Sequence, residues 1–215
     1  MIGFFSGLMK TALLFFYHLT RILGIPNYGV AIILLTVSIK ALLYPLTAKQ
    51  IKSMRAMRDL GPEIKVLQEK YKDDKVKQQQ EIAGLYKKAG VNPLAGCLPL
   101  LIQMPILTGI FYAIRDFSYV RQPSFLWIKN LAVSDPFYIL PIVAALTTYI
   151  SSMQSVSNAA GQQNKMTALF MPVFIGYMTM RFPAALGLYW VVSNLLQIAQ
   201  QWLICRAPAS STPAG

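Results

Sequence analysis

Long apolar runs alternate with polar segments along this chain. About 20 apolar residues in a helix cross the roughly 30 Å hydrocarbon core of a bilayer, and five of the runs approach or reach that length. The pattern predicts an all-α membrane protein with five transmembrane helices. These spans are expected at residues 27–47, 94–114, 136–153, 166–181 and 184–204.

The first 23 residues are apolar but contain Lys10, His18 and Arg21. This mixture predicts an N-terminal amphipathic helix, residues 1–23, that lies in the membrane interface. An additional span is the competing interpretation. A cleaved signal peptide is not expected, because no charge precedes the apolar part and no small-residue cleavage site follows it. Asn27 is expected to cap the first span.

Residues 48–90 are highly charged, with eleven Lys or Arg and six Asp or Glu. Narrow apolar stripes at helical spacing predict a cytoplasmic helical hairpin. Gly61-Pro62 is expected to break its first helix, and Asp73-Asp74 to form the turn and cap the second. The hairpin is either a solvated element or a docking arm for a partner or anionic headgroups. Residues 207–215, rich in Ala, Pro and Ser, predict a disordered tail.

The basic residues are distributed unequally between the two sides of the membrane that the predicted spans imply. The chain is 55% hydrophobic and 13% charged, with a formal net charge of +12. Eleven of the 20 basic residues fall in the single segment 48–90, which argues against a nucleic-acid interface and for a cytoplasmic loop. Thirteen basic residues lie on the side of this loop and six on the other. The asymmetry predicts an N-terminus outside and a C-terminus inside.

Lys40 is the one charged residue in the interior of the expected spans, since Arg181 stands at the very end of the fourth. A straight helix places it about 12 Å from the polar segment that begins near Ala48. A lone cation at such depth costs at least about 2.5–3.5 kcal/mol on insertion scales, so a hydrated site is expected around it. The alternative is a lysine that extends to the interface from a tilted helix.

Polar side chains in the spans align into two stripes. Thr36, Lys40 and Tyr44 share one face of the first span, and the last span carries a second face. Together they predict a polar groove, weighted to the cytoplasmic half, whereas single Ser or Thr residues are commonly interhelical contacts. The candidate groove residues are Lys40, Thr36, Tyr44, Gln103, Trp190, Asn194, Gln197 and Gln201.

The sequence lacks the residues that several classes of function require. No carboxylate lies within a span, which argues against a proton- or cation-coupled transporter. There is no phosphate-binding glycine loop, zinc motif or intramembrane His/Asp/Cys cluster, so no enzyme, cofactor or metal site is expected. Cys97 and Cys205 show no ligand spacing. The anion that balances Lys40 is then expected to come from a substrate, and a small-anion channel and a purely structural assembly partner are the rival classes.

A set of short motifs is spread along nearly all of residues 1–206. They are Tyr28-Gly29, Lys40 with Tyr44-Pro45-Leu46, Val91-Asn92-Pro93-Leu94, Gly96-Cys97, Pro99-Leu100-Leu101-Ile102-Gln103-Met104-Pro105, Asp135-Pro136, Tyr138-Ile139-Leu140-Pro141, Leu188-Tyr189-Trp190 and Ser193-Asn194. Through these motifs the chain resembles the YidC/Oxa1/Alb3 family of membrane protein insertases.

The resemblance implies a fold and a function. The fold is five transmembrane helices with a cytoplasmic hairpin after the first and an external amphipathic helix before it. The function is an insertase in the bacterial plasma membrane that moves short polar tails of nascent membrane proteins through a hydrated, cytoplasm-open groove into the bilayer. The implied partners are nascent membrane proteins and lipid, with the Sec translocon and the ribosome as candidates, and no nucleic acid is expected.

Three departures from the family pattern are expected to matter. Lys40 stands where members usually have Arg, so the charge is kept but the planar five-donor group is not. The sequence shows neither a large extracytoplasmic domain nor a lipoprotein-type cysteine near its start. The tail lacks a long basic extension, which leaves tail-mediated ribosome docking without support.

Overall fold

The computed structural model describes residues 2–92, 98–115, 124–155 and 162–206. In these ranges the chain is helical, apart from loops and one isolated β-bridge between Phe125 and Ile128. The helices are α1 (Ile2–Ile22), α2 (Tyr28–Leu42), α3 (Tyr44–Asp59), α4 (Gly61–Lys70), α5 (Lys75–Lys88), α6 (Leu98–Arg115), α7 (Ile139–Ser155), α8 (Gln162–Arg181) and α9 (Ala184–Arg206).

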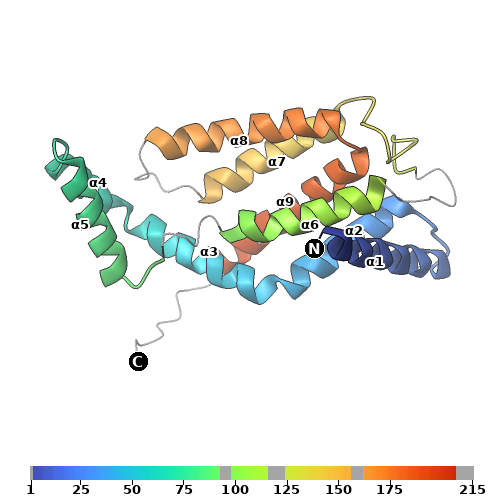
Figure 1. Ribbon diagram of the computed structural model, residues 1–215, viewed down its shortest axis with the longest axis horizontal. Helices are drawn as coiled ribbons and strands as arrows, with labels where there is room; N and C mark the ends of the chain where they lie inside the picture. Colours follow the sequence, from blue (N-terminus) through green and yellow to red (C-terminus); the bar gives the residue numbers. More distant parts are fainter. Residues whose placement is uncertain (1, 93–97, 116–123, 156–161, 207–215) are drawn as a thin grey trace.

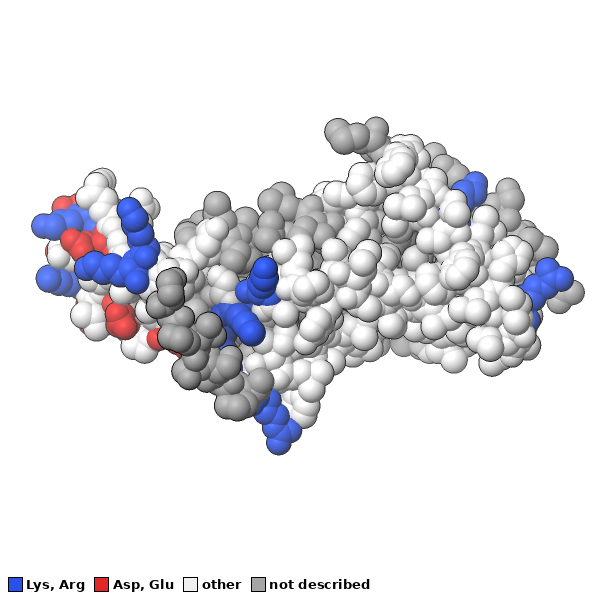
Figure 2. Space-filling model, turned by 90° about the horizontal axis from the view of Figure 1, so that it is seen from below, with Lys and Arg blue, Asp and Glu red and all other residues white. Residues whose placement is uncertain are grey.

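Helices α6 to α9 lie roughly along the long axis of the molecule, and α4 and α5 project from one end (Figure 1). α9 is the central element, since it packs against α2, α3, α6 and α7. α7 and α8 form a pair, while α1 packs against α2 and α6. The face in Figure 2 is largely uncharged over the bundle, and mixed charges gather at the hairpin end.

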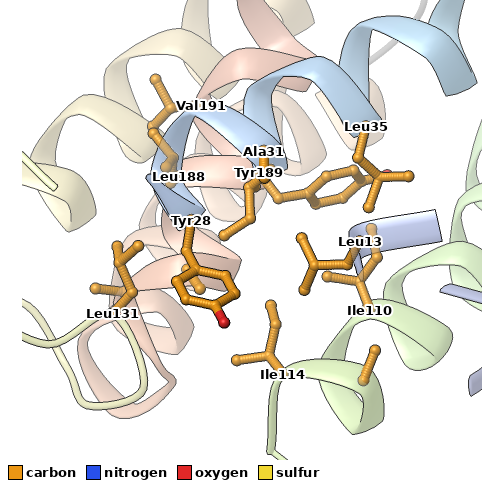
Figure 3. Packing of buried hydrophobic residues seen from close by; sticks show 14 of the residues in the cluster. Leu13, Tyr28, Ala31, Leu35, Ile110, Ile114, Leu131, Leu188, Tyr189 and Val191 are labelled. Atoms are coloured by element: carbon orange, nitrogen blue, oxygen red, sulfur yellow. The ribbon is translucent and has the colours of Figure 1, made fainter. Parts of the chain in front are cut away.

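The core lies where α1, α2, α6 and α9 meet (Figure 3). Leu13 of α1, Ile114 of α6 and Tyr189 of α9 are each no more than 2% exposed. The rings of Tyr17 and Tyr28 stack with centroids 4.0 Å apart, which joins α1 to the start of α2. The predicted helix at residues 1–23 is therefore present, and one side of it is buried in the bundle.

Small residues allow α7, α8 and α9 to approach closely. A Cβ on Gly187 of α9 would lie 2.7 Å from the Thr179 side chain, and one on Gly176 of α8 would lie 3.1 Å from Ala145. Helices in lipid associate through such van der Waals contact, because lipid tails are as apolar as the helices themselves. A larger side chain at Gly187 therefore has no room without a shift of α8.

The expected first span, residues 27–47, is not one helix. Asn27 caps α2 as predicted, and its Oδ1 accepts hydrogen bonds from the N–H groups of Gly29 and Val30. α2 then ends at Leu42, and α3 begins at Tyr44 with a bend of 65°. Pro45 in the first turn of α3 explains the break, because proline has no N–H for the ladder and clashes with the preceding turn.

The expected hairpin, residues 48–90, is also divided differently. Residues 48–59 belong to α3, which packs against α9, so only α4 and α5 form the hairpin. The break at Gly61-Pro62 and the turn at Asp73-Asp74 are confirmed, and Asp74 Oδ1 accepts from the Lys77 N–H. Gly90 follows α5 with a φ of +65°, a conformation that favours glycine.

The other predicted ends shift by a few residues. α7 begins at Ile139 rather than 136, because Tyr138 has a φ of +56° that cannot continue a helix. α8 begins at Gln162, so part of the expected polar link 154–165 is helical. α9 extends to Arg206. α6 covers the expected span 94–114 from Leu98, whereas residues 94–97 and the tail 207–215 lie outside the described residues.

Length and hydropathy single out one candidate crossing among the described residues. No single helix there is both long and apolar enough, but the bent pair of α2 and α3 meets the requirement by composition and length. Gln103–Ile114 and Ile139–Gln154 are shorter apolar helices. The helical class is confirmed, and the count of five spans stays a prediction.

Asp135 organises the loop before α7. Its buried carboxylate accepts hydrogen bonds from Trp127 Nε1 at 3.1 Å, from Phe137 N at 3.1 Å and from Leu140 N at 2.7 Å. The start of α9 is tied to the same loop, since the Ala184 and Ala185 N–H groups donate to the carbonyls of Val133 and Leu131. This loop therefore fixes the starts of α7 and α9 relative to each other.

Removing this carboxylate is expected to destabilise the protein. Asp135→Ala leaves three donors without their acceptor, and hydrogen bonds to charged groups contribute about 1.5–3 kcal/mol each, so we expect a loss of about 2–4 kcal/mol after relaxation. Asp135→Asn, which can still accept at Oδ1, is expected to lose less. Thermal unfolding in detergent measures both, with the exposed Asp73→Ala as control; equal unfolding temperatures for Asp135→Ala and the control would contradict this role.

Candidate functional site

Lys40 lies in the last turn of α2 and faces α9. Its Nζ is 3.4 Å from Gln197 Oε1, and the side chain is half-buried. Because α3 turns away by 65°, Ala48 is only about 8 Å from Lys40 along the α2 axis, rather than the 12 Å of a straight helix. The separation expected from a straight helix was therefore too large, and the depth of Lys40 in a membrane stays a prediction.

A narrow pocket surrounds Lys40 between α2, α3, α6 and α9. Its volume is about 40 Å³, which is room for roughly three water molecules at 10–15 Å³ each. The sequence-predicted residues that line it are Thr36, Lys40, Gln103, Gln197 and Gln201. The fold therefore brings five of the eight candidates together, from three different helices.

Lys40 is the only charged residue among the described residues that line this pocket. The remaining polar groups are hydroxyls and amides, which orient dipoles toward a cation without neutralising it. Ionised groups in a membrane are normally paired with one another or face water. The pocket thus presents a positive charge to whatever enters it.

Trp190 and Asn194 occupy a different place from the Lys40 pocket. Trp190 Nε1 donates to Thr148 Oγ1 at 3.0 Å, and the Asn194 amide is hydrogen-bonded to the hydroxyls of Thr147 and Thr148. These bonds join α9 to α7, so both side chains are engaged in helix packing. The polar stripe predicted on α9 therefore has two sets of neighbours: Trp190 and Asn194 contact α7, whereas Gln197 and Gln201 line the Lys40 pocket.

Tyr44 lies apart from the pocket as well. It is the first residue of α3, directly after the break, and 46% of its side chain is exposed. The prediction assumed that the helical phase of α2 continued through Tyr44. The 65° bend ends that phase, which places the ring outside the pocket lining.

Tyr189 and Gln50 are buried polar residues that also line the pocket and were not among the candidates. The Tyr189 hydroxyl accepts from Gln103 Nε2 at 2.6 Å, and the residue is 1% exposed. Gln50 of α3 is buried, and its Nε2 has no hydrogen-bond partner among the described residues. Tyr189 is an aromatic residue in an apolar run, a pattern typical of the core. Gln50 lies in the segment that was expected to form the hairpin. Periodicity therefore did not indicate that either residue belongs to the pocket.

The pocket offers no metal site. No group of three or more His, Cys, Asp and Glu side chains converges within the part of the chain that the structure describes. Cys205 is a free, exposed thiol at the end of α9, and Cys97 lies outside the described residues.

Cysteine labelling can measure how far water reaches. Thr36 and Thr47 both line the pocket, but Thr36 is fully buried whereas Thr47 is half-buried. In a background without native cysteines, Thr47→Cys is expected to react with a small charged thiol reagent at least about tenfold faster than Thr36→Cys, because thiolate formation is disfavoured by burial. Equal rates would mean that water reaches Thr36 as readily as Thr47 when the protein is in the membrane.

Comparison with known proteins identifies related chains. A family model described as "60Kd inner membrane protein" matches residues 3–211. Membrane protein insertase YidC 2 of Bacillus anthracis is 47% identical over 195 residues, which cover 88% of this chain and 76% of that protein. Membrane protein insertase MisCA of Bacillus subtilis is 48% identical over 184 residues, with 83% and 70% covered.

A solved structure agrees with this match. The crystal structure titled "Active YidC insertase crystal structure with the first transmembrane domain resolved" has a TM-score of 0.71 and 32% identity to this chain. The match covers 92% of this chain and 45% of that one, so the chain spans less than half of the solved protein. The agreement of family model, relatives and fold shows that the chain belongs to the YidC/Oxa1/Alb3 family of membrane protein insertases.

Proposed function

We propose that this protein inserts membrane proteins by drawing an acidic segment of a nascent chain toward Lys40. The observation that carries the mechanism is a cation between α2 and α9 whose pocket, within the described residues, contains amides and hydroxyls but no carboxylate. The family membership supports the insertase function itself. The comparisons give no support to the small-anion channel considered from the sequence.

The electrostatic attraction between Lys40 and an acidic segment has a magnitude that suits reversible binding. Opposite charges about 4 Å apart at an effective dielectric constant of about 20 attract by roughly 4 kcal/mol before desolvation is subtracted. This attraction is sufficient to recruit a polar tail and small enough to release it. The step is non-covalent, so the proposal requires neither a nucleophile nor a cofactor.

Entry of a chain requires the pocket to widen. A volume of about 40 Å³ holds a few waters but no polypeptide. Because α3 bends at Tyr44 and forms one wall, a change in the α2–α3 angle would open the pocket toward the cytoplasmic side. The proposed resting state is therefore narrow, and the substrate selects a wider one.

The apolar part of the substrate is proposed to leave along α7 and α8. These helices expose Ile142, Leu146, Phe170, Val173 and Tyr177 outside the core. Such side chains, together with Met171, Met178 and Met180 of α8, can pack against varied apolar sequences. α7 and α8 contact each other extensively, so they can form a continuous apolar surface for a departing helix.

The proposed arrangement in the membrane follows the charge asymmetry. Five spans, α2 with the start of α3 and then α6 to α9, lie in the bacterial plasma membrane, with the N-terminus outside, the hairpin and C-terminus cytoplasmic, and α1 in the outer interface. The partners proposed for the protein are nascent membrane proteins and lipid, with the hairpin available to the ribosome or the Sec translocon. No nucleic-acid binding by the chain itself is proposed.

Charge at position 40 is expected to decide which substrates are inserted. Lys40→Arg should retain insertion, and Lys40→Ala and Lys40→Glu should reduce insertion of acidic-tailed substrates by at least about tenfold, since loss of about 1.4 kcal/mol already gives that factor. Reconstituted liposomes and a small single-span substrate with acidic, neutral or basic tails provide the measurement.

The tail series distinguishes charge from packing. With Lys40→Glu, a basic tail should partly recover insertion, whereas Lys40→Met should be defective only with acidic tails. Loss of insertion to the same extent for all three tails would assign Lys40 a structural role. Thermal unfolding of each variant identifies those that fail to fold.

The topology can be tested in intact cells. Gln80→Cys in the hairpin should be protected from a membrane-impermeant thiol reagent, and Val133→Cys in the loop before α7 should react, because the basic residues place these segments on opposite sides. Permeabilised cells serve as the positive control. Labelling at position 80 from outside would reverse the arrangement and remove the cytoplasmic entry route.

A further inference from the structure

A second, larger pocket lies beside the Lys40 pocket, where α3 meets the ends of α7 and α9. Its volume is about 350 Å³, within the range of 300–1,000 Å³ typical of small-ligand sites. The two pockets share Ile51, Met54 and Gln201 as a wall. No role assigned to the Lys40 pocket accounts for this larger space.

Three arginines line the larger pocket. Arg55 and Arg58 come from α3, Arg206 ends α9, and none of the described lining residues is acidic. Arg55 Nη1 donates to the Cys205 carbonyl at 2.9 Å, and the Arg206 guanidinium lies 4.8 Å from the Trp202 ring centroid. Two of the three guanidinium groups are therefore positioned by neighbours that leave their charge uncompensated.

The rest of the pocket is amphipathic. Ile51 and Met54 form an apolar wall, and Trp202 is 55% exposed, as is typical of aromatic residues at membrane interfaces. Gln154 contributes a buried Oε1 with no hydrogen-bond partner among the described residues. A ligand that fits this lining carries a negative charge, an apolar part and a hydroxyl donor.

We propose that this pocket, formed by Arg55, Arg58, Arg206, Trp202 and Gln154, binds the headgroup of an anionic phospholipid. The arginines bind the phosphate, Gln154 Oε1 accepts from a headgroup hydroxyl, and Met54 and Trp202 contact the first part of the acyl chains. Basic pockets between helices on the cytoplasmic side are suited to such headgroups, because one guanidinium group can donate two parallel hydrogen bonds to the oxygens of a phosphate.

Charge and apolar surface together favour lipid over the other anions. A free phosphate would use the arginines but leave the apolar wall in water. An acidic peptide segment would bury its polar backbone against Ile51 and Met54 at a cost. Figure 2 shows basic side chains between the hairpin and the uncharged bundle surface, where a headgroup region is expected.

Native mass spectrometry of the full chain in detergent tests the proposal. Phosphatidylglycerol and phosphatidylcholine with identical acyl chains are titrated separately, and the bound lipids are counted. We expect one phosphatidylglycerol to be retained at least about tenfold more strongly than phosphatidylcholine. Soluble glycerophosphoglycerol should not displace it, since that molecule lacks the acyl chains.

Arginine variants locate the site. Arg58→Gln with Arg206→Gln keeps the Arg55–Cys205 bond and should weaken phosphatidylglycerol binding about 25-fold, since each basic residue near an anionic headgroup contributes about fivefold. The matched control is Lys87→Gln with Lys88→Gln at the end of α5, which removes the same charge from the hairpin and should change binding less than about twofold. A third variant, Arg55→Gln alone, should weaken binding about fivefold if it folds.

Trp202 fluorescence provides a local readout. In a Trp127→Phe, Trp190→Phe background, phosphatidylglycerol with brominated acyl chains should quench Trp202 more than the matching phosphatidylcholine does. Equal quenching, unchanged binding by the arginine double variant, or equally tight binding of soluble glycerophosphoglycerol would each overturn the lipid site. Displacement of the lipid by an acidic peptide at lower concentration than by phosphatidylglycerol would overturn it in favour of substrate entry. These experiments measure lipid binding, so their outcome does not depend on whether the proposed insertase mechanism is correct.

Discussion

The cost of holding one uncompensated charge at the edge of an apolar bundle governs this structure. Lys40 has a glutamine oxygen at 3.4 Å and, in the described part of its pocket, no carboxylate. A cation in that position is tolerated only where water and dipoles reach it. The break at Pro45 and the turn of α3 supply that access, because they bring polar α3 residues such as Gln50 to the same pocket. The charge and the bend are therefore two parts of one arrangement.

α9 connects this pocket to the rest of the bundle. One side of it is bound to α7 through Trp190, Asn194 and the threonine hydroxyls, while Gln197 and Gln201 on another side line the Lys40 pocket. The α7 side includes direct side-chain hydrogen bonds, whereas the other side borders a narrow pocket with polar lining residues. Motion that admits a substrate is thus most readily placed on the α2–α3 side, with α7 and α9 as the fixed part.

Resemblance and physical pattern supported different parts of the result. The family motifs pointed to an insertase, which the comparisons confirm. Periodicity placed Thr36, Lys40, Gln197 and Gln201 on two polar stripes, and the structure brings all four to the lining of one pocket, while their role as a substrate site stays a prediction. The assumption of a straight first span was wrong, and periodicity missed Tyr189 and Gln50, whose side chains look like core and surface until their neighbours are known.

The sequence by itself determined the helical class, several caps and turns, the isolated lysine and the concentration of charge in residues 48–90. These features depend on local spacing and on residues such as Asn27, Pro62 and Asp74, whose effects reach only a turn or two. Only the tertiary structure decided that α3 turns by 65° onto α9, that the α9 stripe is divided between two neighbours, and that three arginines meet at one pocket. Those outcomes depend on the angle between helices and on which faces pack, and packing between residues distant in the chain leaves no periodic signal.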